Sequence, residues 1–299
     1  MVKVDIFDDS FHTLMDTKQD PVLVAEGFSF TEGPIWHGKE KHLTFTDFPN
    51  NRIYRWSESG GTRIIKEMSN KSNGLVYDHL GRILACEGTT SRVARMDADM
   101  SNYEVLATHY QDKQLNSPND IILHSNGMIY FTDPQFGRRP TGAGLGRPQE
   151  LDFQGIYMLN PDTLLLTLVE DKVSNPNGLC LSLDEKKMYV ADTPRHCILV
   201  FDILSDGKLA NMLTFGVVSN KGDGKPDGVK IDVEENVWCT AQGGVQVFNR
   251  GGRLLAAIQF EERSGNLCFG GDDLKSLFVC SGTKVFSLRC KIPGQKLKI

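Results

Sequence analysis

Six polar side chains, each at the head of a short apolar segment, are the residues of this sequence best suited to bind a metal ion. They comprise two carboxylates and four carboxamides: Glu32, Asn73, Asn119, Asn177, Asp227 and Asn266. All of their ligand atoms are oxygens, which hard divalent cations prefer. Two carboxylates near one axis repel each other, and a divalent cation between them removes the repulsion. The set predicts one divalent ion, with Ca²⁺ as first choice and Zn²⁺, Mn²⁺, Mg²⁺ or Fe²⁺ as alternatives.

An alternative interpretation is that these positions are ordinary turn residues, because most are followed by glycine, and Gly and Asn both tolerate a positive φ. A turn does not, however, require Glu at the first position and Asp at the fifth. We therefore predict Glu32, Asn177 and Asp227 as direct ligands, with Asn119 binding directly or through water. Asn73 and Asn266 would line the wall of the site.

The segments that must position these side chains form a repeat. Each copy has a leading polar residue, an apolar strand, a polar turn and a second apolar strand, as in 32–36 followed by 43–47. A third, aromatic or β-branched segment follows, and a fourth where room allows. The leading residues are 41, 46, 58, 50 and 39 residues apart, which is the spacing of four-stranded propeller blades. We therefore predict an all-β fold, a six-bladed β-propeller in a single domain over residues 1–299, with a central metal-binding channel.

In a ring of six blades the leading residues converge at one end of the channel. The N-terminal segment 2–7 is expected to pair with the last blade and close the ring, since closure removes exposed sheet edges. A β-sandwich or two smaller barrels is the competing arrangement. The equal placement of one polar residue before each first strand weighs against it.

Six motifs follow one another in order around these residues: Glu32-Gly-Pro-Ile-Trp, Asn116-Ser-Pro-Asn-Asp, Asn175-Pro-Asn-Gly-Leu, Tyr189-Val-Ala-Asp-Thr, Lys225-Pro-Asp-Gly-Val and Asn266-Leu-Cys-Phe-Gly-Gly. Over about residues 22 to 290 this series resembles the gluconolactonase/regucalcin (senescence marker protein) family, and Ser117-Pro-Asn-Asp is most similar to its gluconolactonase branch. The resemblance implies a catalytic metal on Glu32, Asn177 and Asp227, and a substrate-proximal Asn119 beside Asp120. Ser117 stands where the regucalcin branch has Arg, so regucalcin's sugar contacts do not transfer there.

The implied reaction fits the chemistry of these residues. A lactone is an ester, and hydrolysis needs a polarised carbonyl and a carboxylate that accepts a proton from water. Asp227 is predicted to be the general base as well as a ligand, with Asp120 as the alternative base and Asn119 orienting the substrate. We expect hydrolysis of a sugar-acid lactone or a related small lactone. The alternatives are an organophosphate hydrolase of the same fold and a non-catalytic metal-binding regulatory protein.

A long insertion in the third unit, residues 134–154, is the main departure from the repeat. Its length suits a binding loop or lid, and a purely decorative loop is the alternative. Arg138 in this loop and His196 after the fourth unit's second strand are predicted as substrate contacts, together with Asn73 and Asn266.

The composition of the sequence limits the kinds of partner that this protein is expected to bind. The net charge of −5 argues against nucleic-acid binding, and no apolar run reaches the length of a membrane span. The N-terminus has no signal-peptide pattern. The seven cysteines include no Cys-x-x-Cys pair, so they predict reduced, buried thiols in a cytoplasmic protein. The expected partner is a small-molecule lactone, and the expected assembly a monomer or homodimer.

Overall fold

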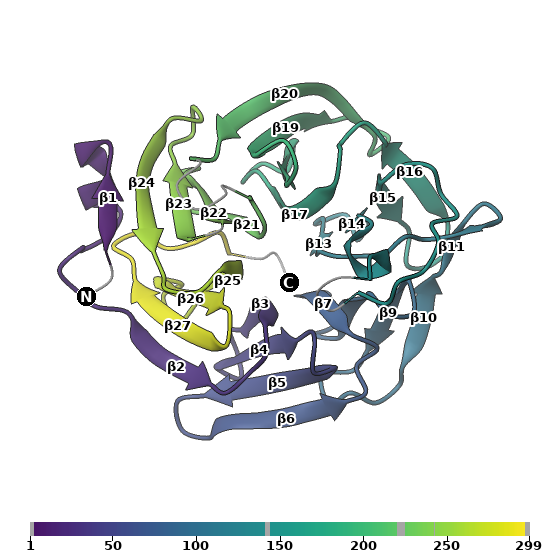
Figure 1. Ribbon diagram of the computed structural model, residues 1–299, viewed down its shortest axis with the longest axis horizontal. Coiled ribbons are helices and arrows are strands. Elements are labelled where there is room, and N and C mark those ends of the chain that lie inside the picture. Colours follow the sequence, from purple (N-terminus) through teal and green to yellow (C-terminus); the bar gives the residue numbers. More distant parts are fainter. Residues whose placement is uncertain (1–2, 141–143, 220–224, 242, 297–299) are drawn as a thin grey trace.

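Six antiparallel sheets surround a central channel in the computed structural model (Figure 1). The structure describes residues 3–140, 144–219, 225–241 and 243–296. This arrangement confirms the predicted all-β, six-bladed propeller.

The first three blades follow the predicted repeat, each with its innermost strand first in the chain. Their strands are β3 (Thr31–His37), β4 (His42–Asp47), β5 (Arg52–Ser57) and β6 (Gly61–Glu67); β7 (Ser72–Tyr77), β8 (Ile83–Glu87), β9 (Arg92–Met96) and β10 (Glu104–Ala107); and β13 (Ile121–Leu123), β14 (Ile129–Asp133), β15 (Gly155–Leu159) and β16 (Leu166–Glu170). A small hairpin, β11 (His109–Tyr110) with β12 (Lys113–Gln114), separates the second blade from the third.

The last three blades repeat the order. Their strands are β17 (Pro176–Leu181), β18 (Lys187–Asp192), β19 (Cys197–Ile203) and β20 (Leu209–Val217); β21 (Val229–Ile231), β22 (Val237–Ala241), β23 (Gly244–Phe248) and β24 (Leu254–Gln259); and β25 (Ser264–Gly270), β26 (Ser276–Ser281) and β27 (Lys284–Arg289). The sixth blade therefore has three strands from its own part of the chain.

The prediction that segment 2–7 completes the last blade and closes the propeller is wrong. Strand β2 (Val22–Glu26) occupies that place and pairs with β27, whereas β1 (Val4–Ile6) extends the fifth blade by pairing with β24. Between them lies the short 3₁₀ helix η1 (Asp9–Thr13), whose Phe11 is fully buried and packs near Trp238. Burial of this aromatic ring fixes the segment between the two blades, so the later stretch reaches the open edge.

Apolar side chains fill the spaces between neighbouring blades rather than the central channel. Trp238 of the fifth blade lies edge-on to Phe269 of the sixth, with ring centroids 5.7 Å apart. Phe131 and Tyr157 of the third blade pack with Leu84 of the second. Because a buried side chain of this kind contributes about 1.5–3 kcal/mol, these layers hold the blades at fixed angles around the channel.

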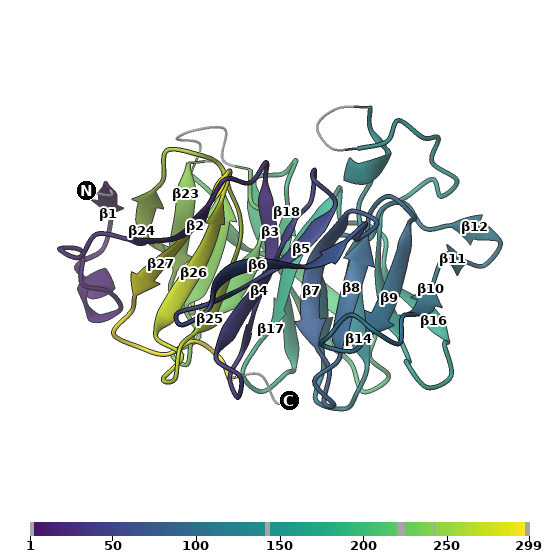
Figure 2. The ribbon, with the colours of Figure 1, turned by 90° about the horizontal axis from the view of Figure 1, so that it is seen from below.

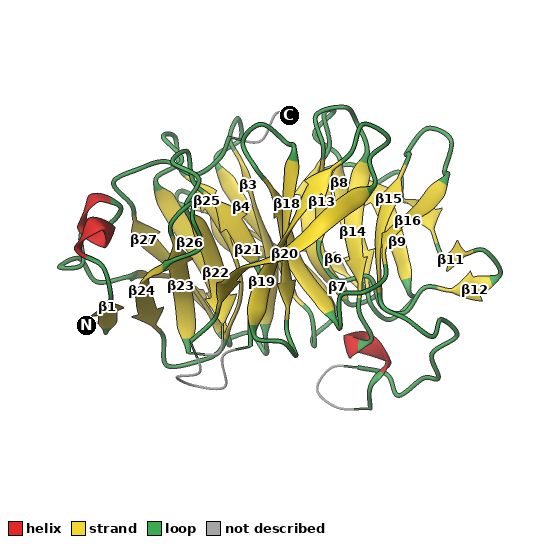
Figure 3. Cartoon of the chain, turned by 90° about the horizontal axis from the view of Figure 1, so that it is seen from above, coloured by secondary structure: helices red, strands yellow, loops and turns green. Residues whose placement is uncertain are grey.

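The innermost strands all run in one direction, so the channel has two distinct ends. The last described residues of the chain lie at one end, where these strands finish: Gln295 N–H donates to the carbonyl oxygen of Ile231, the last residue of β21 (Figure 2). Figure 3 shows the second 3₁₀ helix, η2 (Phe136–Arg138), at the other end, where they begin.

The cysteines agree with the expected chemistry: all seven are buried and carry free thiols. Among the described residues, no helix has the length and apolar character needed to cross a membrane.

Candidate functional site

The six strand-leading polar residues lie where the innermost strands begin, at the end of the channel opposite to the C-terminal segment. We call this set the ring: Glu32, Asn73, Asn119, Asn177, Asp227 and Asn266. Each is at most 9% exposed. The repeat therefore places them as predicted, because every leading residue occupies the same position in its blade.

Backbone hydrogen bonds between neighbouring blades hold the ring together. Gly74 N–H donates to the carbonyl oxygen of Asn119 at 2.7 Å, and Gly178 N–H donates to that of Asp227 at 3.0 Å. A Cβ on Gly178 would lie 2.3 Å from the same Asp227 oxygen, and its φ lies outside the left-handed region. This glycine therefore permits close approach of two blades, which rules out the alternative interpretation of Asn177-Gly178 as a turn.

Glu32 and Asp227 are the two carboxyl groups of the ring, and both are buried. Burial raises the pKa of Glu32 well above its usual range, and the nearby Asp227 raises it further. Burial also raises the pKa of Asp227 to about 6, against the opposing effect of Arg263. Even with Arg263 beside Asp227, the deprotonated form of Glu32 is therefore unfavourable unless a further cation binds between them.

Asn177 supplies an acceptor that lacks a donor. Its Nδ2 donates to Thr193 Oγ1 at 3.1 Å, and its side chain also bonds to Asp227. Its Oδ1 is buried and has no hydrogen-bond partner among the described residues. A buried acceptor without a donor is costly. Beside two repelling carboxylates, this oxygen fits the donor set of a hard divalent ion.

Arg263 is a site residue that the sequence analysis missed. Its Nη2 lies 2.5 Å from Asp227 Oδ2, and its guanidinium lies over the Phe30 ring at 5.4 Å. It precedes the sixth motif, three residues before Asn266. The signal that could have found it is its position one residue before β25, at the ring end of the channel.

Asp120 and Lys230 form a second charged layer, one step further along the channel. Lys230 Nζ lies 3.7 Å from Asp120 Oδ2, although the residues belong to the fifth and third blades. Asp120 Oδ1 accepts from Ile121 N–H at 3.0 Å. Its charge also raises the pKa of both Glu32 and Asp227. Asp120 is therefore close to the ring and partly engaged by the channel wall.

The remaining carboxamides hold the wall in different ways. Asn73 bonds through its backbone, since its carbonyl oxygen accepts from Thr46 Oγ1 at 3.2 Å. Asn266 Oδ1 accepts from Leu267 N–H at 2.9 Å. For Asn119 the hydrogen bonds that we find within the described chain involve only the backbone, so its side-chain amide is available to a ligand.

Arg138, predicted as a substrate contact, is 5% exposed and lies inside its own loop. Its guanidinium donates to the carbonyl oxygens of Asn116 at 2.7 Å and Leu115 at 2.6 Å. Arg147 of the same loop donates to Ser91 Oγ at 2.8 Å. These contacts tie the loop to the second and third blades, so Arg138 positions backbone instead of facing the channel. Residues 141–143 of loop 134–154 lie outside the described part.

His196, the other predicted contact, lies in the turn between β18 and β19 at the ring end and is partly buried. Its backbone N–H donates to the Thr193 carbonyl oxygen at 3.3 Å. It therefore neighbours Thr193, which itself bonds to Asn177.

A different cluster of possible ligands, His37, Glu40 and His42, lies at the opposite end of the channel. Its ligand atoms lie within 4.8 Å of one another. The two imidazole rings are stacked, however, with centroids 4.9 Å apart and planes 18° apart. Stacked rings direct their in-plane lone pairs side by side, not toward one point. His42 Nε2 also bonds to Tyr77 at 3.1 Å, so this cluster fits a metal ion less well than the ring does.

The protein is therefore a six-bladed propeller with a ring of buried polar residues at one end of its channel. This ring contains two carboxyl groups and, within the described chain, an acceptor without a hydrogen-bond donor, Asn177 Oδ1. The sequence comparisons narrow this class. The chain belongs to the SMP-30/gluconolactonase/LRE-like family, whose sequence model matches residues 30–283.

Individual relatives cover between 83% and 98% of the chain. It is 29% identical to a gluconolactonase of Zymomonas mobilis, over 98% of this chain and 87% of that protein. It is 26% identical to pentonolactonase XacC of Haloferax volcanii, over 83% of this chain and 80% of that one. A solved gluconolactonase structure from Xanthomonas campestris is 30% identical and superposes with a TM-score of 0.89, covering 96% of this chain and 94% of that one.

Proposed function

We propose that this protein hydrolyses lactones of sugar acids with the help of one divalent cation. The observation that carries the proposal is the site at the ring. Two buried carboxylates with raised pKa values lie beside Asn177 Oδ1, which has no hydrogen-bond partner among the described residues. The gluconolactonase and pentonolactonase relatives support the class of substrate. Ca²⁺ remains the first choice of ion, because every candidate ligand atom is an oxygen.

Glu32, Asn177 and Asp227 would hold the cation, and Asn119 would complete the protein's contribution directly or through water. When bound, the cation supplies Lewis-acid polarisation of the lactone carbonyl. The fixed backbone bonds between blades keep the three ligand residues in place before substrate arrives.

Asp227 is the favoured proton acceptor. In the metal-free protein burial raises the pKa of Asp227 to about 6. A bound divalent cation lowers this pKa and keeps the carboxylate deprotonated, which is the form that accepts a proton. Arg263 holds Oδ2 of this carboxylate, which fixes its orientation. Asp120 remains the alternative base, but its oxygens face Ile121 N–H and Lys230, which favours a role in the wall.

The test is a pH-indicator assay over a panel of aldonolactones, run with the native protein, after chelation, and after Ca²⁺ is restored. We expect turnover that is lost on chelation and recovered with the ion. Turnover of a phosphotriester without turnover of any lactone would favour the organophosphate hydrolase. Cation binding without hydrolysis of any substrate would favour the regulatory protein.

A further inference from the structure

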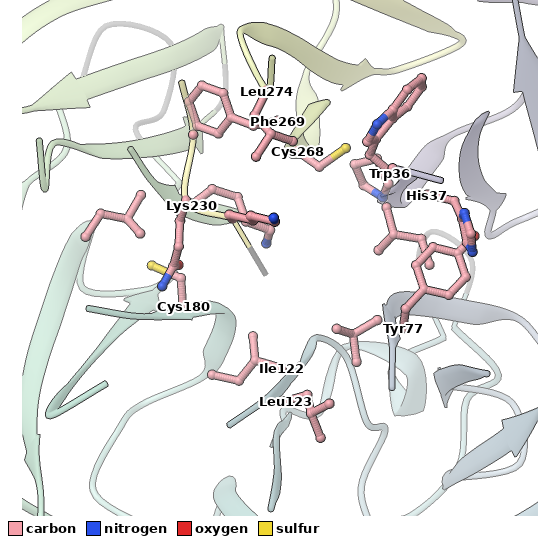
Figure 4. Close-up of a pocket in the computed structure, with 18 of the residues that line it drawn as sticks. Trp36, His37, Tyr77, Ile122, Leu123, Cys180, Lys230, Cys268, Phe269 and Leu274 are labelled. Atoms are coloured by element: carbon pink, nitrogen blue, oxygen red, sulfur yellow. The ribbon is translucent and has the colours of Figure 1, made fainter. Parts of the chain in front are cut away.

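A large cavity occupies the end of the channel opposite to the ring. Its volume is about 900 Å³, and its wall is formed by the far ends of the innermost strands. Figure 4 shows Trp36, Tyr77, Leu123, Cys180 and Phe269 around it. Sites for small organic ligands have about 300–1,000 Å³ and mainly apolar walls. The cavity therefore has the size and lining of a binding site.

The C-terminal segment narrows the mouth of this cavity. Val233 N–H donates to the Pro293 carbonyl oxygen at 3.1 Å, and Gly294 N–H donates to that of Leu274 at 2.9 Å. Gln295 N–H donates to the Ile231 carbonyl oxygen at 3.0 Å. The segment thus joins the neighbouring fifth and sixth blades at this end of the channel, where residues 293–296 form part of the cavity lining.

Lys230 is a cation at the floor of the cavity. It starts on the fifth blade and lines the cavity, and its Nζ lies near Asp120 Oδ2 of the third blade. At 3.7 Å the Asp120 contact is too long for a hydrogen bond. Within the described chain, the hydrogen bond that we find for Nζ is to the Val229 carbonyl oxygen at 3.0 Å. An ammonium group has three donors, so two remain for a ligand.

The acidic residues of the cavity's rim already have partners. Asp78 pairs with Arg82 at 2.7 Å, and Asp272 with Lys41 at 2.9 Å. Asp273 pairs with Arg289. A fourth acid in the lining, Glu185, accepts a hydrogen bond from Ser125 Oγ. Lys39 and Lys296 also line the cavity, so together with Lys230 the cations of the lining favour a negatively charged ligand.

We propose that this cavity binds an organic monoanion with an apolar body, and that the acid group of the ligand accepts hydrogen bonds from Lys230. The apolar body lies against the wall formed by Trp36, Leu123 and Phe269. The cavity adjoins the ring through the Lys230–Asp120 ion pair, but binding of the anion does not depend on the proposed lactonase activity.

The probe is 1-anilinonaphthalene-8-sulfonate, an aromatic monoanion, added to the full-length folded protein and followed by fluorescence. We expect saturable binding of one probe per chain. Leu123→Trp fills the cavity, and Lys230→Met removes the cation; each should weaken binding by about tenfold or more. Leu213→Trp, on the exposed outer strand β20, is the matched control and should bind within about twofold of wild type.

The outcomes separate the cavity from other binding places. Absence of saturable binding overturns the proposal. So does binding that survives both cavity substitutions, or binding that is lost in the ring variant Glu32→Gln. If the cavity variants do not fold, crystals of the unmodified protein soaked with the probe decide: density against Leu123 and Lys230 supports the proposal, and density only elsewhere overturns it.

Discussion

The two ends of the central channel are built from the same six strands but have opposite chemistry. Where the strands begin, Glu32 and Asp227 are buried, and the charge of Asp227 raises the pKa of Glu32. Where they end, the wall is formed by side chains such as Trp36, Leu123 and Phe269. The same six innermost strands therefore form an acidic ring at their first residues and an apolar cavity at their last residues.

This contrast explains why the sequence repeat predicts the polar residues at one end of the channel but not the cavity at the other. Polar residues at one register position of six strands converge by symmetry, so six short motifs are enough to define the ring. Apolar residues at the far ends are also what a buried strand needs. They carry no separate signal in the sequence for a cavity.

The largest expected effect on activity comes from a substitution at the acidic end of the channel. Asp227→Asn removes the proposed base, and we expect kcat for the best lactone to fall by about 10³-fold. Steady-state kinetics with saturating Ca²⁺ measure it. Asp206→Asn, in an exposed hairpin at the other end, is the matched control and should retain wild-type activity. Near-normal turnover of Asp227→Asn with the ion still bound would refute Asp227 as the base and make Asp120→Asn the next variant to test.

The second prediction tests at which end of the channel the cation binds. Because the ion binds the folded chain and not the unfolded one, Ca²⁺ at 100 times its Kd should stabilise the protein by about 2.7 kcal/mol, which raises Tm by several degrees. Glu32→Gln should abolish this shift in thermal unfolding. His37→Ala, in the cluster at the opposite end, should leave it unchanged, and the reverse pattern would move the ion to that cluster.

The pH dependence of the same shift has a definite sign. Burial raises the pKa of both carboxylates, so in metal-free protein their protonated forms are the more compatible with folding. Their contribution to stability is present at low pH and is lost as the pH rises through the folded-state pKa, about 6 for Asp227. The ion requires the deprotonated forms. The Ca²⁺-dependent rise in Tm should therefore be larger at about pH 7.5 than at about pH 5.5.

Sequence alone was sufficient for the fold and the ring because both depend on a register repeated six times. Features that occur once were harder to find. Arg263 lies beside Asp227, but a single Arg in a connecting segment has no repeated counterpart. The closing strand was misplaced because 2–7 and Val22–Glu26 both have a strand-like pattern, and only the burial of Phe11 decides between them. Arg138 resembled a substrate contact because its backbone acceptors are invisible in the sequence.

A smaller effect tests that single arginine. Arg263→Gln removes the ion pair that orients Asp227, and losses of about 10–100-fold are typical when a partner of a metal-binding carboxylate is removed. We expect kcat/KM to fall by about tenfold, with partial recovery in Arg263→Lys. Arg253→Gln breaks a surface Arg–Asp pair with Asp8, also 2.5 Å long, and should leave the kinetics unchanged. Equal kinetics for both glutamine variants would show that Arg263 does not position Asp227.

The smallest effect on activity is expected at Arg138, where sequence and structure give different roles. Arg138→Gln leaves the carbonyl oxygens of Leu115 and Asn116 without their donor, at a cost of about 1–3 kcal/mol in the free energy of unfolding. Denaturant unfolding measures this loss, and Arg139→Gln, at the adjacent exposed position, is the control. Since the guanidinium faces backbone, KM should change less than stability does. A large rise in KM with unchanged stability would restore Arg138 as a substrate contact and show that the loop rearranges when the lactone binds.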